Sequence, residues 1–429
     1  MKLSFLKNKE SKNAMWLIGG RVMQMVLSLF VGVLSARYLG PSNYGLISYG
    51  FSLVNFFMSF CTLGINSVII KDFFDHPEEQ GQAIGSAILM RALASFCSGI
   101  LVVGVSFFMD YGDWNTVIVV VLCSVSLLFH VLDTLKYWFQ AQYKSNVTAI
   151  AIFIAYVATS AYKVVLLILK KNVFWFAFAT SVDYIVFGIL LLIFYKKSNG
   201  PKLSFSWKKG KSLLRKSYHY ILSGMLVAIY GQTDKLMLKQ MLDEAAVGYY
   251  ATAVAVCGMW TFVLTAIIDA MYPTIVQSFK QDQKLFERKN RQLYAIVFYI
   301  SVFVSVMFLI FGDLGIKILY GDAYMPAVMP LKIITWYTAF SYFGVARNVW
   351  MVCNEKQKHL KYMYVLAAIM NVALNLIFIP MWGPSGAAFA SLITQIFISI
   401  VLPYCIKELR PNAKLMLEAI VLKDVFPKK

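Results

Sequence analysis

Long apolar stretches dominate the chain, and short polar or charged segments separate them. A helix needs about 20 apolar residues to cross a hydrocarbon core of about 30 Å. Twelve stretches approach that length, and we predict spans at 14–36, 44–70, 81–109, 114–135, 147–169, 173–195, 216–239, 246–272, 293–312, 329–350, 361–381 and 384–406. They are continuously apolar, whereas barrel strands alternate apolar and polar residues. The pattern predicts an all-α integral membrane protein of about twelve transmembrane helices.

The composition supports this class, and the loop charges add an orientation. Of the 429 residues, 59% are hydrophobic and only 14% are charged, too few for the surface of a soluble fold. The net charge of +19 is concentrated in every second loop: the N-terminus, 196–216, 280–291, 354–361 and the tail after Lys407. By the positive-inside rule both termini are cytoplasmic, and the basic residues indicate topology rather than a nucleic-acid partner.

The longest predicted cytoplasmic loop divides the helices six and six. We predict an N-lobe over 1–195, a basic linker over 196–215, a C-lobe over 216–406 and a cytoplasmic or interfacial tail over 407–429. A faint repeat relates the lobes, because RYLGPSNYGLISYG (37–50) and QMLDEAAVGYYATA (240–253) share a leucine and a glycine at equal spacing. Bundles with parallel repeats place their substrate path between the lobes.

Three segments carry a resemblance to a known family. ARYLGPSNYGLISYG (36–50), TDKLMLKQMLDEAAVGYYATA (233–253) and NVALNLIFIPMWGPSGAAFASLITQ (371–395) resemble the Wzx-type polysaccharide-unit flippases of the multidrug/oligosaccharidyl-lipid/polysaccharide (MOP) exporter superfamily. The resemblance implies a MATE-like fold of two six-helix lobes in a bacterial inner membrane. It implies transfer of undecaprenyl-pyrophosphate-linked oligosaccharides to the outer leaflet for O-antigen, capsule or exopolysaccharide assembly, beside the polymerase and glycosyltransferases of that pathway.

Several charged side chains lie within the predicted spans, where each costs about 2.5–3.5 kcal/mol on insertion scales. They are Arg21, Arg91, Lys163, Asp234, Lys235, Asp269 and Arg347. We expect all except Asp269 to line a central cavity, where the cations bind the pyrophosphate of a lipid-linked sugar. Arginine suits this task because its planar guanidinium holds two phosphate oxygens at once.

Each of these residues also has a structural interpretation. Arg21 and Arg91 lie about a third of the way into their spans, too deep for easy snorkelling, which favours the cavity role. For Lys163 the alternative is snorkelling, and for Arg347 it is a helix-end or lipid-headgroup contact. Asp234 and Lys235 point to different faces of one helix, so the alternative for each is a structural pair.

Asp269 is the predicted ion-coupling residue, since a shielded carboxylate can carry a proton or sodium ion. The alternative is a polar helix end. An enzyme acting on lipid-linked sugars is disfavoured, because the four histidines are scattered and no sizeable loop carries a carboxylate pair. We therefore expect no catalytic residue, metal or cofactor. The alternative function is a cation- or proton-coupled drug antiporter of the same superfamily, which should present acidic rather than basic deep residues.

Overall fold

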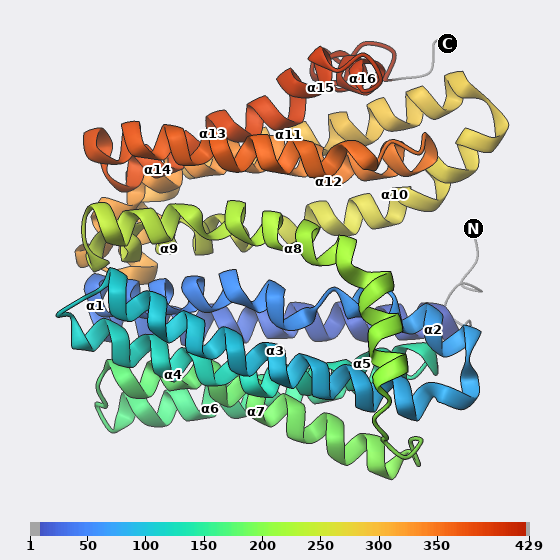
Figure 1. Ribbon diagram of the computed structural model, residues 1–429. Helices are drawn as coiled ribbons and strands as arrows, with labels where there is room; N and C mark the ends of the chain where they lie inside the picture. The colour runs from blue at the N-terminus through green and yellow to red at the C-terminus, as the bar shows by residue number, and fades with distance from the viewer. Residues whose placement is uncertain (1–8, 426–429) are drawn as a thin grey trace. The chain divides into compact units, whose positions relative to one another are not determined.

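The computed structural model describes the backbone of residues 9–425 and the side chains of residues 29–221 and 224–425. Within these residues every regular element is helical (Figure 1). The chain forms two compact units, Met1–Ala228 and Ile229–Lys429, and the boundary falls inside one long helix. The observed elements therefore agree with the all-α class that the apolar pattern predicts.

Unit 1 is built from long antiparallel helices with short connections. Its helices are α1 (Lys9–Thr62), α2 (Ile69–Asp75), α3 (Gln80–Met109), α4 (Trp114–His130), α5 (Thr134–Ala141), α6 (Ser145–Ile168), α7 (Val173–Lys197) and the first part of α8 (Trp207–Met241). In Figure 1, α3 and α4 run side by side, as do α6 and α7. Residues of α2, α3, α5, α6, α7 and α8 form a core that includes Ile69, Leu135 and Phe139.

Unit 2 continues with the rest of α8 and ends in a short helix outside the long ones. Its helices are α9 (Glu244–Gly258), α10 (Thr261–Gln281), α11 (Gln283–Tyr320), α12 (Val328–Cys353), α13 (Lys358–Trp382), α14 (Pro384–Ile396), α15 (Leu402–Cys405) and α16 (Arg410–Ile420). A π-helical turn over Phe397–Val401 joins α14 to α15. Such turns widen a helix locally and are frequent at functional sites.

Nine helices in the described part of the chain are long and apolar enough to cross a membrane. One of them, α1, covers the first two predicted spans, and α8 and α12 correspond to two further predicted spans that are not among the nine. The first two spans are divided at Gly40, whose φ of 72° interrupts α1 directly before Pro41. Glycine tolerates a positive φ, and proline cannot donate the next helical hydrogen bond.

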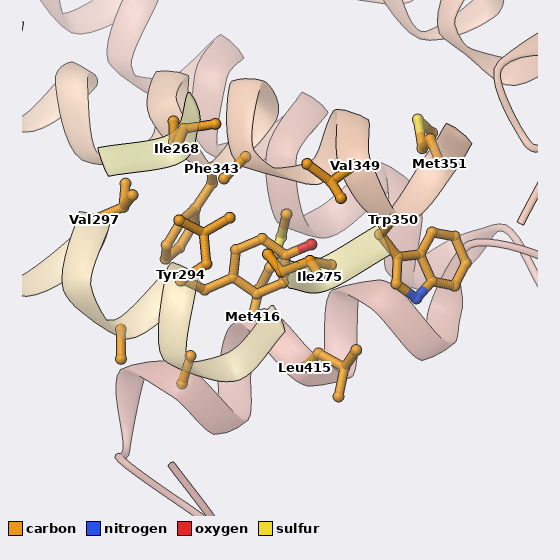
Figure 2. Close-up of a cluster of buried hydrophobic side chains, with 14 of the residues drawn as sticks. Ile268, Ile275, Tyr294, Val297, Phe343, Val349, Trp350, Met351, Leu415 and Met416 are labelled. Carbon is orange, nitrogen blue, oxygen red and sulfur yellow. The ribbon is translucent and has the colours of Figure 1, made fainter. Parts of the chain in front are cut away.

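The last helix of unit 2, α16, packs against the apolar core of that unit. Figure 2 shows side chains of α10, α11, α12 and α16 in one apolar cluster, with Tyr294 next to Phe343 and Met416. The Tyr294 hydroxyl accepts a 2.6 Å hydrogen bond from the Asn412 amide. The predicted interfacial tail helix is thus α16, and one of its faces is buried against α11.

The predicted linker is partly extended and partly helical, and it is attached to unit 1. The Ser204 amide donates to the Gly81 carbonyl at 3.3 Å, and the Ser86 hydroxyl accepts from the Ser206 amide at 2.9 Å. Helix α8 then begins at Trp207, and its first turn places Lys209 2.8 Å from Asp72. These contacts explain why the boundary between the units lies after 228 and not at the end of the linker.

Candidate functional site

A buried carboxylate in unit 2 gathers polar side chains from four helices. Asp234 lies on α8, Tyr250 on α9, Asn371 and Asn375 on α13, and Ser391 on α14. The two asparagines are four residues apart, so they share one face of α13. The asparagines and Ser391 interrupt largely apolar sequences, and the helices pack so that these polar residues meet at Asp234.

The hydrogen bonds of this Asp234 network satisfy both carboxylate oxygens. Asn375 and Asn371 donate to Oδ1 at 2.7 and 3.1 Å. Ser391 donates to Oδ2 at 2.5 Å, and the Tyr250 hydroxyl donates to the same oxygen. All four donors are neutral, so dipoles stabilise the negative charge without neutralising it.

Burial makes the negative charge of the Asp234 carboxylate energetically important. Asp234 is 8% exposed and both asparagines are fully buried. The Oδ1 of Asn375 is also buried and has no hydrogen-bond partner. Carboxylate, amide and hydroxyl oxygens are the ligands that hard cations prefer, and a shielded carboxylate can alternatively take up a proton. The network can therefore hold one small positive charge.

Asp234, Asn375 and Ser391 lie at a similar depth in unit 2, and Asn371 lies one turn deeper. Asp234 and Asn375 each precede the end of their helix by seven residues, and Ser391 follows the start of α14 by seven. At 1.5 Å per residue this is about 10 Å from that end of the unit. The loop charges predict that this end faces away from the cytoplasm.

Arg347 lies toward the other end, six residues before α12 finishes at Cys353. Its guanidinium is 3% exposed, and one nitrogen donates to the Ile398 carbonyl at 3.1 Å. Nε of the same side chain is buried and has no hydrogen-bond partner. The structure therefore places this predicted binding residue inside unit 2, beside the π-helical turn.

Arg91 connects three helix ends within unit 1. Its guanidinium donates to the Cys61 carbonyl at 3.3 Å, the Thr134 hydroxyl at 2.6 Å and the His130 carbonyl at 3.2 Å. It also lies 3.0 Å from Nδ1 of the His130 ring. With 2% of Arg91 exposed, little of the side chain is open to a pyrophosphate in this conformation.

The other predicted residues have varied surroundings. Lys163 on α6 is half-buried and interacts electrostatically with Asp183 on α7, which accepts a 3.4 Å hydrogen bond from Thr159. Lys235 is half-buried on α8. Asp269 is exposed on α10 and is not part of the Asp234 network.

Arg21 belongs to α1, but its side chain lies outside the described residues. Among the side chains that are described, no group of three His, Cys, Asp or Glu residues is placed to hold a metal ion.

Asp234 is among the residues predicted from the sequence, and its four donors are not. Two signals point to them: asparagines at i and i+4 in the apolar run NVALN, and serine and glutamine at i and i+4 in SLITQ. Neutral polar residues are common in membrane helices as packing contacts, so the charges alone attracted attention. Asp183, in the middle of α7, is a charged residue within a predicted span that the predicted set omits.

Solved structures of membrane transporters share the fold of this chain. The lipid II flippase MurJ, in an inward closed conformation, matches with a TM-score of 0.75 and 15% identity over 97% of this chain and 94% of that chain. An inward-facing multidrug resistance MATE transporter of the MOP superfamily matches with a TM-score of 0.68 and 14% identity over 92% and 95%. The chain is thus a multi-pass membrane protein with the fold of MOP-type flippases and transporters.

The sequence comparisons identify the family. The family described as polysaccharide biosynthesis protein matches residues 11–279, which is more than half of the chain, and the chain belongs to that family. No curated protein matches the sequence. The resemblance to polysaccharide flippases is confirmed by this family and by the fold together.

Proposed function

We propose that the protein flips undecaprenyl-pyrophosphate-linked oligosaccharide units from the cytoplasmic to the outer leaflet of a bacterial inner membrane. The observation that supports this most is a polysaccharide-biosynthesis sequence on a chain whose fold matches a lipid II flippase along almost its whole length. The product serves assembly of a surface polysaccharide such as O-antigen, capsule or exopolysaccharide. Its partners in this proposal are the lipid-linked substrate, membrane lipid and the polymerase and glycosyltransferases of the pathway.

The proposed substrate contacts are the deep cations. Arg21, Lys163 and Lys235 are the residues of the predicted set for which we propose direct contact with phosphate, since the described lysines are only half-buried. Arg91 and Arg347 are almost completely buried and bonded within their own units, so for them we favour structural or electrostatic roles. The mechanism that we propose is alternating access of the two lobes to a cationic central cavity.

For energy coupling we propose Asp234 in place of the exposed Asp269. A coupling residue must be shielded from bulk water so that occupancy by a cation or proton changes the free energy of the protein. Asp234 meets this requirement through its four neutral donors, whereas Asp269 lies at the surface of α10.

The function is tested in cells that lack the chromosomal copy of the gene. Plasmid expression should restore surface polysaccharide, and its loss should leave the lipid-linked unit in the inner leaflet. Asp234→Asn should reduce restoration strongly, while the matched variant Asp269→Asn should restore it fully at equal protein level. Normal surface polysaccharide without the protein, together with sensitivity to organic cations, would favour the drug antiporter instead.

A further inference from the structure

A line of polar side chains extends from the Asp234 network through the interior of unit 2. Ser391, Gln395 and Ser399 follow one another at four-residue intervals, so they share a face along α14 and the π-helical turn. Ser391 contacts Asp234, and the Tyr230 hydroxyl, one turn before Asp234 on α8, donates to Gln395 at 2.8 Å. We call these three residues, with Tyr230, the polar column.

The far part of the polar column is also continuous. The Gln395 amide donates to the Ser399 hydroxyl at 3.0 Å, and that hydroxyl donates to the Phe340 carbonyl at 2.7 Å. Ser391 and Ser399 are eight residues apart, so the column is about 12 Å long. Hydroxyl and amide groups at this spacing solvate a small cation or relay a proton, which the surrounding apolar core does not.

The polar column ends at a positive charge. Gly344 on α12 has no side chain, and a Cβ built there would lie 3.7 Å from the Gln395 amide nitrogen, 3.9 Å from the Ser399 hydroxyl and 3.9 Å from a terminal nitrogen of Arg347. The three side chains therefore converge on one point. In the described part of unit 2, no carboxylate forms an ion pair with Arg347, and its Nε has no partner.

From this arrangement we infer that Arg347 is an electrostatic barrier that prevents cations from leaking along the polar column between Asp234 and the cytoplasmic end of unit 2. The inference rests on the coupling role proposed above for Asp234. A cation or proton that leaves Asp234 toward Ser399 approaches a fixed guanidinium in a medium of low dielectric. A unit charge acting over about 10 Å at an effective dielectric of about 20 slows such passage by more than about tenfold.

The barrier also explains why a positive charge is retained at this depth. A buried guanidinium with unmet donors is costly. Its bond to the Ile398 carbonyl offsets only part of that cost, because Nε of the same side chain is buried without a partner. A neutral donor such as glutamine would serve the carbonyl equally well, so hydrogen bonding alone does not account for arginine.

The test measures cation leak in liposomes that contain the purified protein and no lipid-linked glycan. A potassium diffusion potential drives the flux, and a sodium-sensitive or a pH-sensitive dye inside reports it. Wild-type protein and Arg347→Lys should show little cation leak, and Arg347→Gln should raise the cation flux by about tenfold or more. Adding Asp234→Asn to Arg347→Gln should return the flux to the wild-type value.

Two outcomes would overturn the barrier. Equal leaks in Arg347→Lys and Arg347→Gln would show that the geometry of the Ile398 contact matters and the charge does not. A leak that persists after Asp234→Asn would show that the cation does not follow the polar column. If Arg347→Gln fails to fold, Gln395→Glu cancels the charge with Arg347 in place, and a tight Gln395→Glu protein would equally contradict the inference. Because no glycan is present, these results are independent of whether the protein flips lipid-linked sugars.

Discussion

Individual side chains hold the interior of each unit together where apolar packing alone would leave polar groups unmet. In unit 2 the carboxylate of Asp234 accepts from two asparagines, a serine and a tyrosine. Removing it would leave buried donors without an acceptor, which costs more than a hydrogen bond normally contributes. The same carboxylate thus has a structural and a proposed functional role, and the two can be separated.

For Asp234→Ala we predict a loss of about 1–3 kcal/mol in the free energy of unfolding, because buried donors are left unsatisfied. Asp269→Ala on the exposed face of α10 is the control and should change stability by less than about 0.5 kcal/mol. Thermal unfolding of the purified proteins in detergent measures both. Equal shifts in the two variants would mean that the Asp234 network does not stabilise unit 2.

A substitution of Arg91 can distinguish a role in substrate binding from a role in stabilising unit 1. Lysine has a single compact ammonium and cannot reach acceptors on three helix ends as the guanidinium does. We expect Arg91→Lys to lower the unfolding temperature, and transport per folded molecule to remain near that of the wild type. Unchanged stability with lost transport would instead support the predicted contact with pyrophosphate.

At the scale of elements, the attachment of the linker to α3 depends on two glycines without room for a side chain. A Cβ at Gly85 would lie 2.3 Å from the Ser204 carbonyl oxygen, and one at Gly81 would lie 2.2 Å from that of Lys202. Gly99 on the same helix has no atom within 4 Å of its Cβ position. The close approach of the linker is therefore specific to the start of α3.

We predict that Gly85→Ala detaches the linker, whereas Gly99→Ala leaves it in place. Hydrogen exchange of residues 201–206, followed by mass spectrometry, should be faster in Gly85→Ala and unchanged in the control. The same exchange rate in both variants would contradict a tight contact between the linker and α3.

The loop between α12 and α13 is joined to the segment before α16 by Glu408. Lys356 and His359 donate to this carboxylate at 2.8 and 3.2 Å and lower the pKa of Glu408 to about 2. The folded-state pKa lies below the unfolded value of about 4.3, so the stabilisation is present above about pH 4 and is lost as the pH falls toward 2.

Glu408→Gln should therefore lower the unfolding temperature near neutral pH and have little effect near pH 2, where the wild-type carboxyl is also protonated. Unfolding of both proteins across this pH range checks the prediction. Because Glu408 is partly exposed, high salt should reduce the difference. A variant whose deficit stays constant with pH would contradict the ion pair.

The existence of the long helices could be predicted from the sequence, and their interruptions could not. The predicted spans 114–135 and 246–272 are largely apolar, yet α4 ends at His130 and α9 ends at Gly258, each inside one of these spans. At His130 the freed carbonyl accepts from Arg91, a partner on another helix. The hydropathy pattern gives the length and apolarity of a helix, but it does not indicate hydrogen-bond partners on other helices.

At the scale of the whole molecule, the helix count, loop charges and family resemblance were all accessible from the sequence because lipid imposes strong constraints. The convergence of Asp234, Asn371, Asn375 and Ser391 was not, because it depends on the rotation of three helices about their axes. The sequence singles out the predicted cations only by their depth within the predicted spans. Depth does not distinguish Arg91, which connects helix ends, from a residue that faces a cavity.

The central claim is that this member of the polysaccharide biosynthesis family moves a lipid-linked glycan across the bilayer. Proteoliposomes loaded with undecaprenyl-pyrophosphate-linked oligosaccharide test it directly, with a glycosidase outside that cleaves only glycans exposed on the outer leaflet. We predict cleavage of more than the initially exposed half with the wild-type protein, and cleavage limited to that half in protein-free liposomes. Cleavage that stops at the same half with the folded wild-type protein, with and without a sodium or proton gradient, would contradict the account.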